Sequence, residues 1–349
     1  MLRACRAALW MCVLLAALAA SVPAAAREPQ VVFLEGDAAR AAIVNDASDH
    51  YFQRLQPLEM AAKTGAVPNG NLDAQRAETR RRYRDAILPF SADEQAALRA
   101  YVAALAPMFA AYPRYARLPW RFVKVSDAIE GGLPHTRADF IVLSESVAAG
   151  LTQLRQQLPA DAATARAGML LVHEQMHVLQ RLDPGRFDSL YARVFGFVHT
   201  QTLVLPPELV TNQVVNPDGS ACCWLFPLRH NGGYVLPYLV LAERAGPRRM
   251  PQDFRMLAVQ VAGDGRSFRV QRDTDGRARV GDLAQVADYV AAFPLTENYY
   301  DPNEAAADLF AQLVLYDGLL RERLPAAQGA TLDRGLAPLR RWCRANLGS

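Results

Sequence analysis

Apolar positions recur every three or four residues along several stretches of the chain, most clearly over residues 161–182. This spacing places the apolar side chains on one face of a helix and predicts that this helix is largely buried. Weaker patterns of the same kind predict further helices towards both ends of the chain. These cover residues 37–63 with an interruption at Pro57, 72–88, 92–106 after a Ser91–Glu94 capping box, 185–197, 302–323 and 331–345.

Short segments rich in β-branched residues lie between these helices. Residues 121–125 and 139–143 have the composition of strands and are separated by a glycine-rich turn at 131–135. Residues 256–261 and 267–271, joined through Asp264-Gly265, are typical of a hairpin. We therefore expect an α+β fold in which a small, mostly antiparallel sheet packs on the 161–182 helix, between helical N- and C-terminal parts.

The first 26 residues have the pattern of a cleaved secretory signal. A basic start is followed by an apolar run from Ala7 to Ala20 and by small residues up to Ala26. The apolar run is about 14 residues long, shorter than the ~20 that span a bilayer. We therefore expect export to a bacterial periplasm or medium, with no stable membrane insertion after cleavage.

The rest of the chain divides by texture into four regions. A helical N-terminal region precedes the strands and the 161–182 helix, and a glycine- and proline-rich β insertion separates these from a helical end. We place these regions at residues 27–118, 119–200, 201–296 and 297–349.

Composition narrows the class of protein. Among 349 residues 51% are hydrophobic and 21% are charged, which is ordinary for a globular protein. The net charge of +3 gives no single-sign field for nucleic acid. Only two basic residues are lysines, Lys63 and Lys124, and the arginine and alanine bias is typical of a GC-rich bacterial genome. Nothing indicates the oligomeric state.

Three cysteines, Cys222, Cys223 and Cys343, remain after signal cleavage. In an oxidising compartment one of the adjacent pair could bridge to Cys343. The sequence does not determine which cysteines form the disulfide, and with three cysteines one thiol stays unpaired.

The strongest chemical signal lies in the predicted 161–182 helix, which contains the pentapeptide HEQMH. His173 and His177 stand four residues apart, on one helical face, so both imidazoles can reach one ion. Glu174 follows the first histidine and can point at water bound to that ion. The motif predicts a zinc site with one zinc ion per chain and with Glu174 as the catalytic base.

A catalytic zinc needs a third protein ligand, and the sequence offers two candidates. Asp183 would serve only if the helix stopped soon after His177, and Gln180 stands where that turn would need glycine. Glu304 lies near the start of the second predicted helix, for which Asp301 is a suitable N-cap and Pro302 a suitable first residue.

We favour Glu304 as this ligand, although it could instead complete a capping box with Asp301. Asp308, one turn further along the same face, is expected to accept a hydrogen bond from the non-metal nitrogen of a ligating histidine.

An HExxH helix followed at a distance by an ExxxD helix resembles the gluzincin metallopeptidases, the thermolysin-like clan. The resemblance covers the two helices and extends to the strand at 139–143. It implies a zincin-like fold, a zinc ion held by His173, His177 and Glu304, and Asp308 behind the first histidine. It also implies that the 139–143 strand lies along the cleft and pairs with the substrate backbone.

Three functions follow as expectations. The first is an exported zinc metallopeptidase acting on a peptide or protein. The second is a zinc amide hydrolase acting on cell-wall peptide, and the third is a non-catalytic zinc-binding extracytoplasmic protein. Tyr299, Tyr300, His230 and Tyr234 are candidate donors to an oxyanion by residue type. His135 and His199 are expected not to be ligands, and His50 is expected to be exposed.

Overall fold

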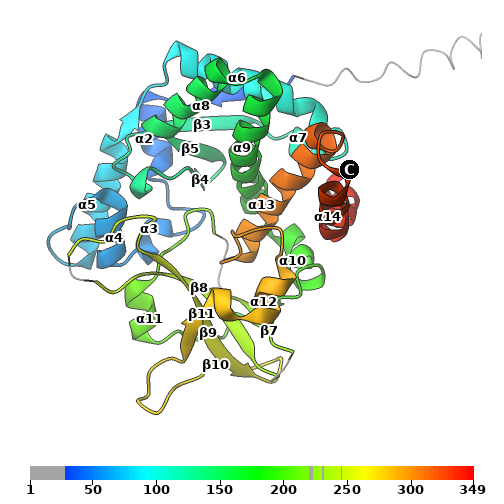
Figure 1. Ribbon diagram of the computed structural model, residues 1–349. Coiled ribbons are helices and arrows are strands. Elements are labelled where there is room, and N and C mark those ends of the chain that lie inside the picture. The colour runs from blue at the N-terminus through cyan, green and yellow to red at the C-terminus, as the bar shows by residue number, and fades with distance from the viewer. Residues whose placement is uncertain (1–27, 220–222, 230–231, 245) are drawn as a thin grey trace, which may run out of the picture.

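The computed structural model describes residues 28–219, 223–229, 232–244 and 246–349 (Figure 1). The predicted signal segment 1–26, Cys222 and His230 lie outside this part of the chain. Within it, no helix combines the length and apolar character needed to cross a membrane.

The first sheet is mixed rather than mostly antiparallel. Its main order is β1-β3-β5-β4, with β2 pairing to β3. β1 and β5 run parallel to β3, whereas β2 and β4 run antiparallel to their neighbours. Parallel pairing is available because long connections separate these strands in sequence. The strands are β1 (Val31–Phe33), β2 (Ile87–Leu88), β3 (Trp120–Val125), β4 (His135–Arg137) and β5 (Phe140–Ser144).

Two long helices carry the two predicted motifs and lie side by side (Figure 1). The helix α9 (Ala160–Leu182) packs against β4 and β5, and α13 (Pro302–Leu315) packs along α9. Gly168 allows a close approach, since a Cβ there would come within 2.8 Å of the Leu315 side chain. The structure confirms the predicted helix over 161–182 and the helix start at Asp301-Pro302.

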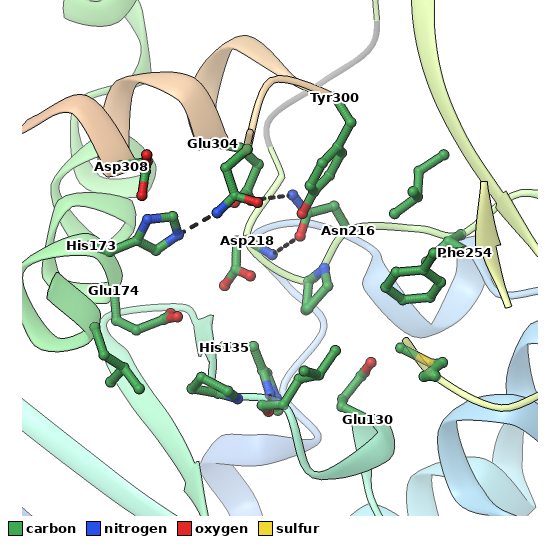
Figure 2. Close-up of a pocket in the computed structure, with 18 of the residues that line it drawn as sticks. Glu130, His135, His173, Glu174, Asn216, Asp218, Phe254, Tyr300, Glu304 and Asp308 are labelled. Atoms are coloured by element: carbon green, nitrogen blue, oxygen red, sulfur yellow. Dashed lines mark hydrogen bonds and ion pairs between the residues drawn. The ribbon is translucent and has the colours of Figure 1, made fainter. Parts of the chain in front are cut away.

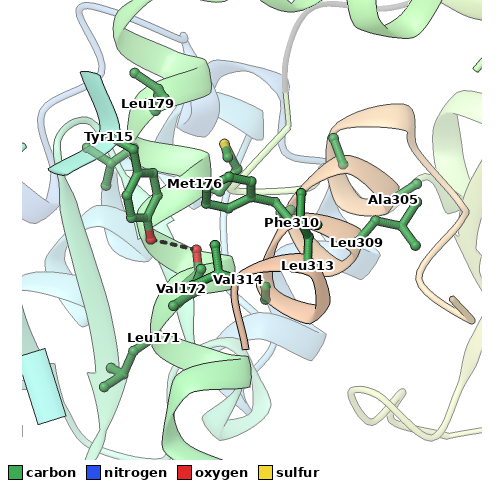
Figure 3. Packing of buried hydrophobic residues seen from close by; sticks show 14 of the residues in the cluster. Tyr115, Leu171, Val172, Met176, Leu179, Ala305, Leu309, Phe310, Leu313 and Val314 are labelled. Atoms are coloured by element: carbon green, nitrogen blue, oxygen red, sulfur yellow. Dashed lines mark hydrogen bonds between the residues drawn. The ribbon is translucent and has the colours of Figure 1, made fainter. Parts of the chain in front are cut away.

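The contact between α9 and α13 is a continuous apolar core. Met176 and Val172 of α9 meet Phe310 and Val314 of α13 (Figure 3), and all four side chains are fully buried or nearly so. Burying one side chain of this size contributes about 1.5–3 kcal/mol. Tyr115 adds a hydrogen bond from its hydroxyl to the Val172 carbonyl at 3.1 Å. This packing fixes the two motif-bearing helices relative to each other.

The predicted helix over 37–63 is wrong in its continuity. The chain forms three short helices instead, because the Asn45 and Asp46 side chains accept hydrogen bonds from backbone N–H groups and stabilise turns. Pro57 begins the third of these helices. The N-terminal helices are α2 (Gly36–Ile43), α3 (Tyr51–Arg54), α4 (Pro57–Thr64) and α5 (Leu72–Asp85).

The remaining helices agree with the sequence pattern where it predicted them. Ser91 and Glu94 form the predicted capping box at the start of α6. The pattern gave no prediction for α8, and α13 ends earlier than expected, in a π-helical turn at Tyr316–Leu320. These helices are α6 (Ala92–Leu105), α7 (Pro113–Ala116), α8 (Glu145–Gln157), α10 (Pro184–Arg193), α11 (Pro207–Asn212), α12 (Ala287–Ala292) and α14 (Ala326–Leu347).

A second, antiparallel sheet occupies the other half of the molecule (Figure 1). The predicted hairpin is confirmed, and Asp264 closes its turn by accepting hydrogen bonds from the N–H groups of Arg266 and Ser267. The strands are β6 (Val198–His199), β7 (Trp224–Pro227), β8 (Tyr234–Leu241), β9 (Phe254–Gly263), β10 (Phe268–Val270) and β11 (Val280–Asp282).

The suggested bridge to Cys343 is wrong. Cys343 is a free thiol on α14, buried in the core around α9 and α13, and burial raises its pKa. Cys223 belongs to a different core, beneath the second sheet, and is disulfide-bonded. The two cysteines therefore lie in separate parts of the fold.

Candidate metal centre

Three side chains from two helices converge on one point, and they are the three that the sequence predicted as ligands. His173 and His177 of α9 and Glu304 of α13 form a group that can hold a metal ion. Figure 2 shows two of them, His173 and Glu304, at the edge of a cavity. The two histidine Nε2 atoms are 3.0 Å apart. Glu304 Oε2 lies 3.3 Å from His173 Nε2, and Glu304 Oε1 lies 3.5 Å from His177 Nε2.

These separations fit a common ion. Donor atoms that bind one ion at about 2.0–2.1 Å with tetrahedral angles lie about 3.3–3.4 Å from one another. The three measured distances bracket that value, with a different Glu304 oxygen facing each histidine. With one donor atom from each residue, the three donors lie within 4.8 Å of one another. His177 and Glu304 are almost fully buried, and 12% of the His173 side chain is exposed. The donors therefore surround a position that is closed on the protein side.

Neither competing interpretation of the third ligand agrees with the structure. Glu304 turns towards the two histidines, while the Asp301 side chain alone caps α13 by accepting from the N–H of Asn303. Asp183 stands at the end of α9 and pairs with Arg186 at 2.5 Å. A continuing helix carries it away from the face that bears the histidines.

Gln180 orients the second histidine, which the sequence analysis did not anticipate. Its Oε1 lies 2.7 Å from His177 Nδ1, and its Nε2 donates to the Asn303 carbonyl at 3.0 Å. Because a carboxamide oxygen only accepts, His177 Nδ1 carries the proton and Nε2 presents its lone pair to the site. The available signal was a buried polar residue three positions after His177, which is one helical turn.

Asn216 holds the carboxylate ligand and was also missed. Its Nδ2 donates to Glu304 Oε1 at 2.5 Å (Figure 2). Asn216 belongs to the loop that follows α11 and precedes β7, where no periodic pattern marks a buried side chain. Only the folded chain brings it to α13.

Glu174 is held in place from the first sheet. The Thr136 hydroxyl on β4 lies 2.9 Å from both the Glu174 carbonyl oxygen and Glu174 Oε2. Burial raises the pKa of the Glu174 carboxyl well above its usual range, and the nearby Asp218 raises this pKa further. The carboxyl faces the cavity from α9 (Figure 2).

Asp218 is a further acid in the site that sequence reasoning missed. It accepts a hydrogen bond from the N–H of Thr136, and its own carbonyl accepts from Asn303 Nδ2 at 3.1 Å. Burial raises the pKa of its carboxyl. Burial would likewise raise the pKa of Glu304, but His177 and His173 hold that pKa well below its usual range.

Asp308 lies beside His173, as expected for a residue one turn along α13 (Figure 2). The structure shows no hydrogen bond between the two side chains. Asp308 Oδ2 instead accepts from Gln312 Nε2 at 2.9 Å. Asp308 therefore acts on His173 through its charge, which is one of the contributions that raise the pKa of that imidazole against its burial.

A cavity of about 350 Å³ opens next to the three ligands. Tyr300 lines it, whereas Tyr299 is buried in the core and accepts a hydrogen bond from the Tyr289 hydroxyl at its carbonyl. Tyr234 lies on β8 and packs against Phe268. One wall is apolar and contains Leu133, Met169, Leu170, Val214, Leu239, Met250 and Phe254.

The other described histidines, His50, His135 and His199, lie outside the candidate ligand group, as expected. His199 is exposed and stacks on Trp224, and His50 is exposed. His135 is buried and lines the cavity floor, but it is not part of the ligand group. Its Nδ1 lies 3.2 Å from the Leu133 carbonyl.

The strand expected along the cleft is the wrong one. The predicted strand, β5, pairs with β3 on one side and β4 on the other, so its backbone is occupied. The edge is β4, which follows the turn at Gly131 and Gly132 and carries Thr136 to Glu174. Its Thr136 N–H is already taken by Asp218.

The chain matches no protein-family model, and no curated protein or solved structure is similar enough to count as a match. The functional interpretation therefore depends on the residues and geometry of this site.

Proposed function

We propose that this chain is a zinc-dependent peptidase with a zincin-like site. The observation that carries the proposal is the convergence of His173, His177 and Glu304 at 3.0–3.5 Å, with Glu174 beside them at the edge of a cavity. Two imidazole nitrogens and one carboxylate oxygen, without sulfur, form a donor set that suits zinc.

The number of ligands favours a catalytic site over a closed structural one. Structural zinc sites are usually filled by four protein ligands, whereas catalytic sites have three and leave one position for water or substrate. Among the described residues the ligand group has three members, and the cavity adjoins it. This favours a hydrolase over the non-catalytic alternative.

The residues of the site have separate roles in the proposed reaction. His173, His177 and Glu304 would hold the zinc ion, which when bound would lower the pKa of a water molecule and polarise the scissile carbonyl. A divalent ion held there would counteract the burial and the Asp218 charge that raise the pKa of Glu174. The ionised Glu174 carboxylate would then accept a proton from the attacking water and return it to the leaving amine nitrogen. The Thr136 hydroxyl, 2.9 Å from Glu174 Oε2, keeps that carboxyl turned to the cavity.

Tyr300 is the proposed donor to the oxyanion that develops on the substrate. It lines the cavity, and burial raises the pKa of its phenol well above the usual range, so the hydroxyl keeps its proton. A donor aimed at developing charge in a site of this kind contributes about 2.7–4 kcal/mol to lowering the barrier.

The decisive experiment compares Glu174→Gln with the unchanged chain. We expect both to bind one zinc ion, and we expect peptide cleavage to fall at least about a hundredfold in the variant, since it loses its proton acceptor. Glu297→Gln, at an exposed glutamate ahead of α13, is the matched control. Equal cleavage by all three proteins would remove Glu174 as the base.

The same assay, run with different substrates, distinguishes a peptidase from a cell-wall amide hydrolase. Cleavage of unstructured peptides favours the peptidase. Activity on cell-wall peptide fragments, with none on casein or peptides, would favour the amide hydrolase that uses the same residues. Export is proposed from residues 1–26 alone, and sequencing the N-terminus of protein recovered from the periplasm or medium tests it.

A further inference from the structure

A second buried cluster of charged residues lies near the metal centre, around Lys63 of α4. Its ammonium group, fully buried, is 3.3 Å from Glu59 Oε1 and 3.0 Å from Glu130 Oε2. It also donates to the Tyr51 hydroxyl at 2.5 Å and to the Val215 carbonyl at 2.8 Å. A charge taken this far from water is tolerated only when such partners surround it.

Glu59 and Lys63 bind both backbone groups of Val215, its N–H and its carbonyl. The N–H of Val215 donates to Glu59 Oε1 at 2.5 Å, and its carbonyl accepts from Lys63. Glu59 and Lys63 are one helical turn apart on α4. Lys63 is 152 residues from Val215 in the sequence. Two successive peptide groups of the loop are therefore fixed to a helix from the N-terminal region.

The next residues of this loop enter the metal centre. Asn216 donates to the carboxylate ligand Glu304, and Asp218 accepts from Thr136, which in turn contacts Glu174. Other segments also hold this loop. The N–H of Val214 donates to the Leu239 carbonyl at 2.9 Å, and Arg181 donates to the Pro217 carbonyl at 2.9 Å. Val215 directly precedes Asn216, so its two hydrogen bonds to α4 restrain the backbone from which the Asn216 side chain extends.

We infer that Lys63 and Glu59 are positioning residues for the metal centre, acting through Val215 and Asn216 on Glu304. This inference rests on the proposed metal site and adds to it a support that comes from another part of the fold. Outer partners of metal ligands commonly change metal affinity by about 10–100-fold when removed. Lys63 acts one step further out, so a smaller effect is expected.

The chain offers a matched control in its other lysine. Lys124 on β3 pairs with Glu94 of α6 at 2.8 Å, and both side chains are mostly buried. Neither residue lines the cavity beside the ligands. Replacing either lysine removes a buried ion pair, but only Lys63 contacts the loop that leads to Glu304.

The test is a double-mutant cycle on zinc affinity, measured by competition with a chromophoric chelator. The proteins are the unchanged chain, Lys63→Met, Asn216→Ala, their combination, and Lys124→Met. We expect Asn216→Ala to weaken zinc binding about tenfold and Lys63→Met about three- to tenfold. The combination should be no weaker than Asn216→Ala alone, because both changes break the same connection. Lys124→Met should lower the melting temperature and leave zinc affinity unchanged.

Cobalt substitution gives a second readout, since the visible bands of Co²⁺ report the arrangement of its ligands. We expect Lys63→Met and Asn216→Ala to shift these bands alike, and Lys124→Met to leave them in place. If Lys63→Met fails to fold because Glu130 is left unpaired, Lys63→Met/Glu130→Gln replaces it. In that variant the glutamine oxygen still accepts from Tyr51 and Tyr83.

The outcomes separate the two proposals. If the unchanged chain binds no zinc, the proposed function fails. If it binds zinc and Lys63→Met binds equally well with the same cobalt spectrum, the positioning role fails and the metal site stands. Additive losses in the double variant would also overturn the connection through Asn216.

Discussion

Two buried clusters of acidic residues lie near each other, and they differ in where their positive charge comes from. In the first, Glu59 and Glu130 surround Lys63, which is a cation built into the chain. In the second, Glu174, Asp218 and Glu304 face two histidines, and no lysine or arginine is among the described residues that line the cavity.

Glu130 and Glu174 show this difference in their pKa values, whereas burial raises the pKa of Glu59 in the first cluster and the two histidines lower the pKa of Glu304 in the second. Burial would raise the pKa of Glu130, yet Lys63 and His135 bring that pKa below its usual range. Burial also raises the pKa of Glu174, and the largest charge contribution, from Asp218, raises that pKa further. Among the described residues that line the cavity, no lysine or arginine offsets the burial of Glu174 and Asp218, and a divalent ion held by His173, His177 and Glu304 would add positive charge there.

The largest predicted effect is the loss of one ligand of the second cluster. A zinc site of this kind has a binding free energy of about 10 kcal/mol or more, to which three protein ligands contribute. His177→Ala removes one of them and should weaken zinc binding by about 4 kcal/mol, or about a thousandfold. Chelator competition measures it, with His199→Ala at the exposed histidine on Trp224 as control. Zinc affinity unchanged in His177→Ala would refute the ligand set.

Metal removal should destabilise the fold by a comparable amount. An ion present at a thousand times its dissociation constant stabilises the folded state by about 4 kcal/mol. We expect a chelator to lower the melting temperature of the unchanged chain by roughly 10 °C, and scanning calorimetry checks this. The melting temperature of His177→Ala should barely respond to the chelator. A response as large as that of the unchanged chain would place the stabilising ion elsewhere.

The first cluster should respond to pH instead. Burial raises the pKa of Glu59 from 4.5 to about 7 against the attraction of Lys63. The folded state therefore binds more protons than the unfolded state between these values. The resulting contribution to stability is full below pH 4.5 and is lost as pH rises through about 7.

Glu59→Gln removes this titration. Between pH 4.5 and 7, the free energy of unfolding of the variant should therefore fall by about 3 kcal/mol less than that of the unchanged chain. Denaturant unfolding at several pH values measures the difference. Asp301, whose pKa burial also raises to about 7, remains in both proteins and should contribute equally. Parallel stability curves for the two proteins would contradict the raised pKa of Glu59.

A smaller effect than these is predicted for the residue that orients His177. Gln180→Ala removes the acceptor at His177 Nδ1 and should weaken zinc binding about tenfold. Gln312→Ala, on the far side of Asp308, is the control and should have little effect. Equal affinities in Gln180→Ala and the unchanged chain would show that the tautomer of His177 is set without Gln180.

The sequence was sufficient for the parts of the site that lie on regular helices. His173, Glu174 and His177 follow from helical spacing, and Glu304 follows from the capping residues that start α13. Their meeting point was predictable because both helices have an apolar face that has to be buried. The α+β class follows from the same patterns.

The rest depends on contacts between segments that no local pattern links. Asn216 and Asp218 come from a loop, and Thr136 comes from a strand of three residues. Lys63 lies on the short helix α4, where no local pattern marks a buried charge, yet it is fully buried. The edge strand was misassigned because β4 is too short to show an alternation, while the more apolar β5 lies inside the sheet.

The most direct test of the central claim is the X-ray absorption spectrum of the purified chain at the zinc edge, after the zinc content has been measured. We predict one zinc ion per chain with two imidazole nitrogens at about 2.0–2.1 Å, oxygen in the remaining positions and no sulfur. A chain that purifies without stoichiometric metal and takes up none, or a spectrum with sulfur ligands, would contradict it.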